Sequence, residues 1–518
     1  MKSKMKNNIL QIMCIALATC ILSCNDSIEE RNMAFPQLNP TNADATAGTW
    51  KPILLTAPDE FSLDAPIAAT SAAFTREINE IKSYQANISN DQRRIIDYWS
   101  AGGVLRWNEI MRELVAKYNR PPYQNADGSY PTPSPANPFA STPFPFSNPP
   151  YAARAYAYVS AAQYDALIAA WHYKKLYNRA APFTIDANFQ VMVPKSSLPS
   201  YPSEDGVLAG VTIEMLKLLF PTEIAFVQQK AEEQKLYRII SGANVRSDVD
   251  AGIILGRKIA SKFIARAAAD GLGQAIGTPA QWKLFETMCI ERGELPWKSL
   301  DVPARPPMLP FFGNVKSFLM SPAAILTNRP PPPPSTNSQA FKNELQEVKE
   351  NSRNVTRENQ RIVTFWADGV GTFTPPGHWN MIATEAFVPQ NFSEVRWARN
   401  LAMLNISMMD AAITCWDSKY FYFNPRPCQM DDSIKTTTGI PNFPAYVSGH
   451  STFSAAAATY LSYVIPAKAI TFKAMANEAS QSRLYGAIHY RSDCEQGFLL
   501  GQRVGQIAIT RASGDGAN

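Results

Sequence analysis

Three short segments between residues 419 and 493 carry the side chains best suited to chemistry. Their sequences are KYFYFNPRP, FPAYVSGHST and SRLYGAIHYRSD. They supply three cations, a hydroxyl, a glycine amide, two histidines and a carboxylate, from the residues Lys419, Arg426, Ser448, Gly449, His450, Arg483, His489 and Asp493. Cations offset the charge of a tetrahedral oxyanion, short donors fill its lone pairs, and an imidazole can attack or ligate its central atom. The three segments therefore predict a buried oxyanion site.

The local sequence indicates how these residues are positioned. Ser448 and Gly449 precede the helix-forming run SAAAATYLSYV, so their amides are expected at a helix N-terminus, where the helix dipole favours an anion. His489 and Asp493 stand at positions i and i+4, and a helix would place them on one face. The carboxylate could then hold one ring nitrogen and leave the other for the oxyanion.

The three segments resemble the superfamily that joins vanadium-dependent haloperoxidases with type-2 phosphatidic-acid phosphatases. Its pattern is K-x6-RP, PSGH and SR-x5-H, and all three blocks occur here in that order. The one departure is Val447, where the family usually has proline. The resemblance implies a helical fold and an oxyanion site that holds vanadate, with phosphate able to occupy the same place.

The resemblance also implies a role for each residue. His489 would be the axial ligand to the vanadium of vanadate, or the nucleophile on phosphorus in a phosphatase. His450 would be the general acid and base. The cations would neutralise the oxyanion oxygens, and Ser448 with the Gly449 amide would donate hydrogen bonds to them; those cations are Lys419, Arg426 and Arg483. Asp493 would support His489.

Three further residues are candidates for the wall of the pocket. Trp416 and Phe443 resemble pocket residues of the chloroperoxidase-like branch. Trp416 has a counterpart in the first half of the chain, Trp171, so core packing explains it equally well. His378, in TFTPPGHWN, could reach the pocket, but its Gly/Pro-rich surroundings favour a histidine in a surface loop.

The second half of the chain repeats the first. Asp165-Ala166 matches Asp410-Ala411, and the same offset continues without a gap to Arg246-Ser247-Asp248 and Arg491-Ser492-Asp493. Apolar residues recur at helical spacing in both halves, so we expect an all-α protein built from two pseudo-repeated helical bundles packed together. The first half has lost the chemistry, because Asp205 stands where the second half has His450 and Asn244 where it has His489. The site is therefore expected in the C-terminal bundle.

The N-terminus is expected to be a targeting segment. Three lysines precede an apolar stretch, residues 9–22, that is too short to span a bilayer. The sequence Ile21-Leu22-Ser23-Cys24 resembles a bacterial lipobox, so we expect export and a lipid anchor on Cys24, with an ordinary signal peptide as the alternative. The predicted organisation is a lipoprotein signal peptide (1–23), a polar tether (24–48), a degenerate N-terminal bundle (49–280) and a catalytic C-terminal bundle (281–518).

Composition limits the remaining possibilities. The 518 residues are 46% hydrophobic and 18% charged, with a formal net charge of +5, which does not indicate a nucleic-acid partner. Four cysteines follow the targeting segment, namely Cys289, Cys415, Cys428 and Cys494. Export permits a disulfide between Cys428 and Cys494, although buried free thiols are favoured. The oligomeric state stays open.

Two chemistries fit the predicted site. A vanadate-dependent haloperoxidase would oxidise a halide with hydrogen peroxide, and an acid phosphatase would cleave a phosphomonoester through a phosphohistidine. The length, the duplication, the pocket residues and the lack of several membrane spans favour the haloperoxidase. A non-catalytic lipoprotein that binds an anion or a partner is a third possibility. The halide and the organic acceptor cannot be predicted.

Overall fold

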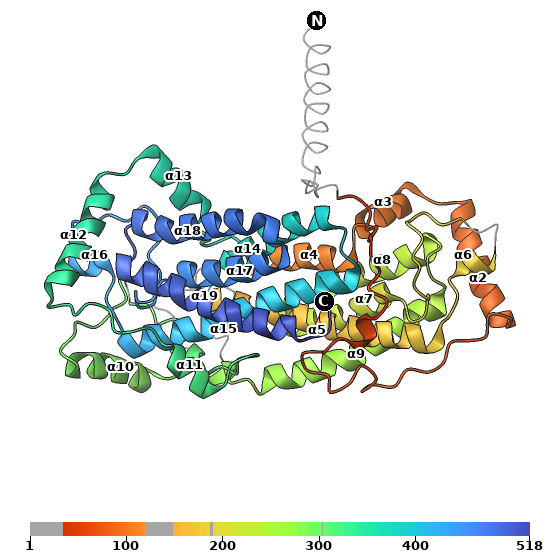
Figure 1. The fold of residues 1–518 in the computed structure, drawn as a ribbon, viewed down its shortest axis with the longest axis horizontal. Coiled ribbons are helices and arrows are strands. Elements are labelled where there is room, and N and C mark those ends of the chain that lie inside the picture. The colour runs from red at the N-terminus through yellow and green to blue at the C-terminus, as the bar shows by residue number, and fades with distance from the viewer. Residues whose placement is uncertain (1–34, 120–148, 187–189, 303, 518) are drawn as a thin grey trace, which may run out of the picture. The chain divides into compact units, whose positions relative to one another are not determined.

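The computed structural model describes residues 35–119, 149–186, 190–302 and 304–517 (Figure 1). Within these ranges the chain is helical and has no β-strand, which confirms the predicted all-α class. The helices of the first half are α2 (Ala72–Ala86), α3 (Asn90–Trp99), α4 (Gly103–Tyr118), α5 (Pro149–Tyr177), α6 (Pro182–Ile185), α7 (Glu204–Leu219), α8 (Ile224–Ile240) and α9 (Arg246–Ala268). Two shorter helices follow, α10 (Pro279–Glu291) and α11 (Pro322–Asn328). Those of the second half are α12 (Gln339–Arg353), α13 (Arg357–Phe365), α14 (Thr374–Phe387), α15 (Glu394–Tyr422), α16 (Pro427–Met430), α17 (Gly449–Val464), α18 (Ala469–Tyr485) and α19 (Arg491–Ser513).

The two halves contain the same helices in the same order. Helices α5 and α15 both have 29 residues, and their first residues are separated by the same offset as Asp165 and Asp410. Each helix from α6 to α9 is separated from its counterpart, from α16 to α19, by that offset as well. Helices α2 and α3 precede α12 and α13 by a slightly larger offset, the one that relates Trp99 to Trp366. The repeat in the sequence therefore corresponds to duplicated structure.

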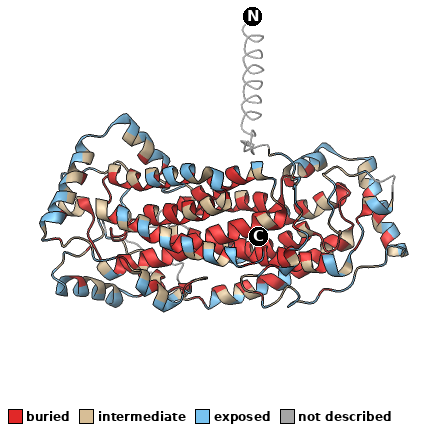
Figure 2. Cartoon of the chain, in the orientation of Figure 1, coloured by how far each residue is buried: buried red, intermediate tan, exposed pale blue. Residues whose placement is uncertain are grey.

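Helices α5 and α15 form the centre of the fold. They pack along each other, and nearly every residue of both is buried, as the red central helices of Figure 2 show. Helices that are buried on all sides need small or apolar residues all round, and the alanine-rich sequence of α5 meets that need. The two halves therefore share one core.

A second pair of contacts explains glycines that repeat in the sequence. Helix α7 packs on α9, and α17 packs on α19. A Cβ atom on Gly256 would lie 2.2 Å from the carbonyl oxygen of Val207, and one on Gly501 would lie 2.2 Å from that of Thr452. Only glycine permits such an approach of two helix backbones.

Buried polar side chains also join the halves. The amide of Asn108 on α4 donates to Asn380 on α14 (2.8 Å), and Asn380 donates to Asn405 on α15 (2.6 Å). Asn405 in turn donates to the hydroxyl of Ser160 on α5 (2.8 Å). Buried amides are costly unless they are satisfied, so this network ties the two halves in one arrangement.

The N-terminal part of the body differs from the predicted tether. The chain forms a compact unit from Gln37 to Asn518. Asp44 is buried and accepts hydrogen bonds from Ser393 (2.6 Å) and Arg396 (2.5 Å) at the start of α15. Residues 37–48 are therefore part of the folded body, and the prediction of a free tether up to residue 48 was wrong. The predicted signal peptide and Cys24 lie outside the described residues, and the boundary between the bundles at residue 280 stays a prediction.

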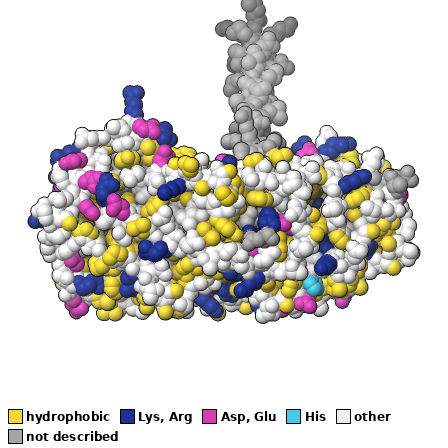
Figure 3. Space-filling model, viewed as in Figure 1, with side chains coloured by type: hydrophobic (Ala, Val, Ile, Leu, Met, Phe, Trp, Pro, Cys, Tyr) yellow, Lys and Arg dark blue, Asp and Glu magenta, His cyan; other side chains and the backbone are white. Residues whose placement is uncertain are grey.

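The surface mixes charge types. On the face drawn in Figure 3, basic and acidic side chains are interspersed among apolar ones. In the part of the chain that the structure describes, none of the helices combines the length and apolar character needed to cross a bilayer.

Candidate active site

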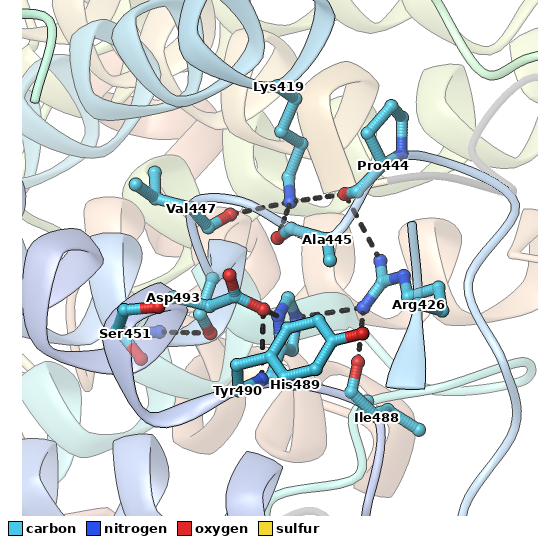
Figure 4. Close-up of polar contacts among 12 residues, drawn as sticks. Lys419, Arg426, Pro444, Ala445, Val447, Ser451, Ile488, His489, Tyr490 and Asp493 are labelled. Carbon is cyan, nitrogen blue, oxygen red and sulfur yellow. Dashed lines mark hydrogen bonds and ion pairs between the residues drawn. The ribbon is translucent and has the colours of Figure 1, made fainter. Parts of the chain in front are cut away.

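The predicted site residues lie where several elements of the second half meet, and Figure 4 shows four of them, Lys419, Arg426, His489 and Asp493. Lys419 lies in the last turn of α15, and Arg426 directly precedes α16. Ser448 caps the N-terminus of α17, where its hydroxyl accepts from the Ser451 amide (3.4 Å). Arg483 lies in the last turn of α18, and His489 lies between α18 and α19. The expected helix N-terminus at Gly449 is confirmed.

Lys419 and Arg426 are fully buried and held by backbone carbonyl groups. The ammonium of Lys419 donates to the carbonyls of Pro444 (2.9 Å), Ala445 (3.0 Å) and Val447 (2.5 Å). The guanidinium of Arg426 donates to three carbonyls, those of Phe443 (3.0 Å), Pro444 (3.5 Å) and Ile488 (2.8 Å). Both cations also lie near the Phe443 ring, 4.9 and 5.0 Å from its centroid. The cations are thus fixed in place, with neutral dipoles around them.

His489 is held between a carboxylate and a cation. Its Nδ1 contacts Asp493 Oδ2 at 2.8 Å, and its Nε2 lies 3.0 Å from Nη1 of Arg426. The carboxylate accepts, so Nδ1 carries the proton and Nε2 presents its lone pair. Asp493 itself is held by the backbone N–H of Tyr490 (3.0 Å). An oxyanion atom that bound Nε2 would replace the hydrogen bond from Arg426.

The contact between His489 and Asp493 confirms the predicted pairing, but the predicted geometry was wrong. His489 is not helical, because α19 begins at Arg491. Asp493 lies in the first turn of α19, where its carboxylate reaches back to the amide and the imidazole that precede the helix. The two residues therefore meet because Asp493 reaches back over the N-terminus of α19, and not because they share one face of a helix.

The electrostatics favour an anion. Burial lowers the pKa of Lys419 from 10.5 to about 7, and Arg426 acts in the same direction. Burial also lowers the pKa of Arg426 and of Arg483 from 12.5 to about 10. Burial lowers the pKa of His489 well below its ordinary value, and the neighbouring cations add to that effect. A buried anion would relieve all of these shifts, because it returns a counter-charge to a desolvated cluster of positive charge.

A cavity of about 230 Å³ opens beside this cluster. Its wall includes residues from the second and third predicted segments and both predicted aromatic residues, namely Trp416, Phe443, Gly449, His450, Arg483 and His489. The rings of Trp416 and Phe443 pack against each other, 5.1 Å between centroids. Trp416 also donates to the carbonyl of Met308 (3.2 Å). Trp416 therefore lines the cavity and packs in the core at once.

His378 does not lie in a surface loop. It is buried in the first turns of α14, and its ring stacks on that of Trp366 with 4.6 Å between centroids. Its Nδ1 contacts Oδ1 of Asp368 at 2.9 Å. The surface interpretation was wrong because TPPG opens a helix here, with proline in the first turn, where its missing N–H costs nothing. His378 does not line the cavity directly.

Asp368 is a site residue that the sequence argument missed. It lines the cavity, and its Oδ2 lies 3.9 Å from Nε2 of His450. Burial lowers the pKa of His450 well below its ordinary value, with Arg483 and His378 acting in the same direction. A signal was present, because the register that pairs Trp99 with Trp366 also pairs Ala101 with Asp368. The charge of Asp368 therefore appears only in the half that contains the candidate site.

The chain's own groups fit a tetrahedral oxyanion. Two atoms of the cavity wall that can donate a hydrogen bond, Thr374 Oγ1 and His450 Nε2, are buried with no hydrogen-bond partner among the described residues, as are two acceptors, Asp368 Oδ2 and Asn442 Oδ1. A Cβ on Gly449 would meet only Phe453 (3.8 Å) and Trp416 (3.9 Å), so packing within the protein does not require glycine there. A side chain would instead occupy cavity space beside the free amides of the helix N-terminus.

The matching place in the first half contains its own counter-charge. Glu204, the counterpart of Gly449, contacts Lys174 (2.8 Å) and Arg238 (3.2 Å). Asp205, the counterpart of His450, lies 3.3 Å from Arg238. Asn244 accepts from Arg238 (2.7 Å) where His489 would stand. Two carboxylates neutralise the two cations that remain, so this half has no excess positive charge for an oxyanion.

The four described cysteines are free thiols, and Cys428 and Cys494 are not joined. Burial raises the pKa of Cys494 to about 12, so its thiol is not ionised near neutral pH.

Comparison with known proteins agrees with this arrangement. Residues 400–513 match the model of the PAP2 superfamily. A bacterial vanadium-dependent iodoperoxidase has a similar fold, with a TM-score of 0.55 and 24% identity, over 70% of this chain and 91% of that one. The apo form of a bacterial vanadium-dependent chloroperoxidase aligns with a TM-score of 0.48 and 13% identity, over 70% of this chain and 93% of that one. A search of curated protein sequences finds no match.

Proposed function

We propose that this chain, whose residues 400–513 match the PAP2 superfamily, is a haloperoxidase that binds vanadate and oxidises a halide with hydrogen peroxide. One observation carries the proposal: three buried cations cluster beside a cavity that His489 and His450 line. The likeness to an iodoperoxidase supports a halide as the substrate.

The position of each residue indicates its proposed role towards the bound anion. Lys419, Arg426 and Arg483 would hold the charge of the anion, and Ser448 with the Gly449 amide would donate hydrogen bonds to its oxygens. His489 Nε2 would be the ligand to vanadium, with the ring held by Asp493. When bound, vanadate would supply the activation of hydrogen peroxide towards the halide.

His450 would move protons beside the bound anion. Its lowered pKa keeps the imidazole neutral near pH 7, so it can take a proton from a peroxide that enters the cavity and return it to a leaving oxygen. Trp416 and Phe443 would exclude water from one wall of the cavity.

A phosphatase is the second candidate, and the match to the PAP2 superfamily favours it. In that reaction Nε2 of His489 attacks phosphorus, the bond to the ester oxygen breaks, and the protonated form of His450, which the negative charge of the bound phosphate favours, protonates the departing oxygen. Water then attacks phosphorus, the bond to His489 Nε2 breaks, and His450 takes the proton from that water. The same cations would stabilise both reactions.

One experiment separates the two reactions. The anion-free protein should not cleave a phosphomonoester; halide oxidation should start when vanadate is added and fall as phosphate competes for the site. A phosphatase would behave in the opposite way, with turnover in the anion-free protein and inhibition by vanadate, which imitates the five-coordinate transition state. Rapid phosphomonoester cleavage, with no halide oxidation after vanadate loading, would reject the haloperoxidase. His450→Ala should impair whichever reaction occurs.

We also propose that the protein is exported and held at a bacterial membrane by a lipid on Cys24. Lipidation of a lipobox requires that cysteine, so Cys24→Ser should move the protein from the membrane fraction to the soluble fraction. Membrane association that persists in Cys24→Ser would reject the lipid anchor.

A further inference from the structure

Asp368 lies between two histidines that belong to different elements. Its Oδ1 is 2.9 Å from Nδ1 of His378, at the start of α14, and its Oδ2 is 3.9 Å from Nε2 of His450, at the start of α17. The side chains of Asp368 and His378 are 6% and 4% exposed, so solvent does not screen their contact. The carboxylate is therefore placed to act on both rings.

The short contact fixes the orientation of the His378 ring. A carboxylate accepts hydrogen bonds, so Nδ1 of His378 is the atom that donates to Asp368. In the described part of the chain the Nε2 atom of His378 has no hydrogen-bond partner, and aromatic rings surround the imidazole, with Phe365 at 4.9 Å and Trp366 at 4.6 Å. The ring is thus held in one orientation with Nδ1 aimed at Asp368.

The backbone also directs the carboxylate. Asp368 has a φ of 46°, in the left-handed region that aspartate tolerates better than most residues. The carbonyl groups of Trp366 and Ala367 lie close enough to the His450 ring to oppose the fall in its pKa. The segment from Trp366 to Asp368 therefore borders His450 with its backbone as well as its side chain.

Asp368 and His450 do not form a hydrogen bond in this structure. Asp368 Oδ2 and His450 Nε2 face each other, both are buried, and neither has a hydrogen-bond partner among the residues described. The gap of 3.9 Å is about 1 Å longer than a hydrogen bond. Hydrogen bonds in catalytic sites are often long in the free enzyme and shorten in the reacting complex.

We propose that His378 is a positioning residue that acts through Asp368, so that the carboxylate orients the imidazole of His450 for proton transfer. His378 holds one carboxylate oxygen, and the other oxygen selects the His450 tautomer with the proton on Nε2. The second nitrogen, Nδ1, is then the one that accepts a proton from the substrate. This inference rests on the proposed function for its effect on turnover, but the orientation of His450 can be measured without any substrate.

Two substitutions of His378 separate positioning from packing. His378→Phe keeps an aromatic ring against Trp366 but removes the donor, whereas His378→Asn loses the ring and keeps an N–H donor near the place of Nδ1. We expect His378→Phe to lower kcat by about 10- to 100-fold, with KM and sulfate affinity unchanged, as for other residues that orient a catalytic group. His378→Asn should recover most of that loss although it is the less stable variant. If His378 served packing alone, His378→Phe would be the more active of the two.

Nitrogen-15 NMR of labelled histidine gives the second measurement, and it is practical because the chain has only four histidines. In the anion-free protein, His450 should show a single tautomer in wild type and in His378→Asn, and a mixture in His378→Phe. An unchanged His450 spectrum in His378→Phe would overturn the proposal even if the enzyme were active. A wild type with neither halide nor phosphomonoester turnover, but with the expected NMR change, would reject the proposed function and retain the positioning role.

Discussion

At the scale of single residues, His489 should be indispensable. His489→Ala removes the proposed ligand or nucleophile and also the partner of Asp493, so we expect turnover to fall by about a thousandfold or more and oxyanion binding to weaken. Circular dichroism should show that the fold is retained. The matched control is Asn244→Ala, at the same place in the first half, which should leave turnover unchanged. Equal damage from both substitutions would mean that the first half contributes to catalysis.

Anion affinity should depend on the protonation of Lys419. Its pKa is lowered to about 7 by burial, so in the anion-free protein it loses its proton as the pH rises through 7. An anion requires the charged form, and sulfate affinity should therefore fall by up to about tenfold per pH unit above 7. Sulfate is the suitable probe because its own charge does not change there. Calorimetric titration between pH 6 and 9 measures the slope.

Lys419→Met is the control for this pH dependence. It should bind sulfate more weakly at pH 6 and show no decrease from this group at higher pH; an unchanged slope would assign the titration to another residue.

The lowered pKa of Lys419 also has a consequence for the stability of the fold. Between about pH 7 and 10.5 the unfolded chain binds more protons at this lysine than the folded chain does. The stability of the anion-free protein should therefore rise with pH through that window, because the cost of burying the charged lysine is lost.

At this scale the sequence predicted most of the residues that lie together in the structure, and it missed some of their contacts for a physical reason. Motif spacing identified the cations, His450 and the pair of His489 and Asp493. It gave no indication that Arg426 donates to His489 or that Lys419 is held by three carbonyls, because those contacts depend on how distant loops meet. Asp368 was missed for the same reason, since it reaches His450 from a segment that lies outside all three motifs.

At the scale of elements, α17 and α19 must pack closely to bring Ser448 near Asp493. The amide of Ser448 donates to the Asp493 carbonyl (2.9 Å), and Gly497 and Gly501 let the two helices approach. Both glycines recur at the matching positions of the first half, and this repeat in the sequence correctly indicated a structural role. Their counterparts in α9, Gly252 and Gly256, let α7 and α9 approach in the same way, so close packing does not itself create a site.

Two glycine substitutions should therefore separate the stability of the fold from its affinity for an anion. Gly501→Ala places a Cβ 2.2 Å from the Thr452 carbonyl oxygen, and we expect it to destabilise the fold by about 1–3 kcal/mol. Gly449→Ala meets no atom closer than 3.8 Å, so stability should be retained while the methyl group weakens sulfate binding. Thermal unfolding and calorimetry measure the two effects. A Gly449→Ala protein with wild-type affinity would contradict an anion beside that amide.

At the scale of the whole molecule, the two halves share the same helices, but only the second half contains the candidate site. The first half keeps Lys174 and Arg238 but satisfies both with Glu204, so it retains the architecture of the site without its charge. The sequence predicted this loss from the substitutions alone. It could not show that the halves share a core, because helical periodicity does not reveal which buried faces meet, and α5 and α15 are buried on nearly every side.

The shared core predicts that the C-terminal half cannot fold alone. Removing residues 1–280 uncovers the length of α15 that packs on α5, and leaves Asn380 and Asn405 without Asn108 and Ser160. Water can hydrogen-bond to the uncovered amides, but it cannot satisfy the apolar face of α15, so exposure of that face is the main cost of the deletion. Residues 281–518 expressed alone should therefore aggregate, or lack near-ultraviolet circular dichroism. Co-expression with residues 24–280 should restore a soluble complex that binds sulfate. A monomeric C-terminal half that unfolds cooperatively and binds sulfate with wild-type affinity would show that the first half is dispensable to the site.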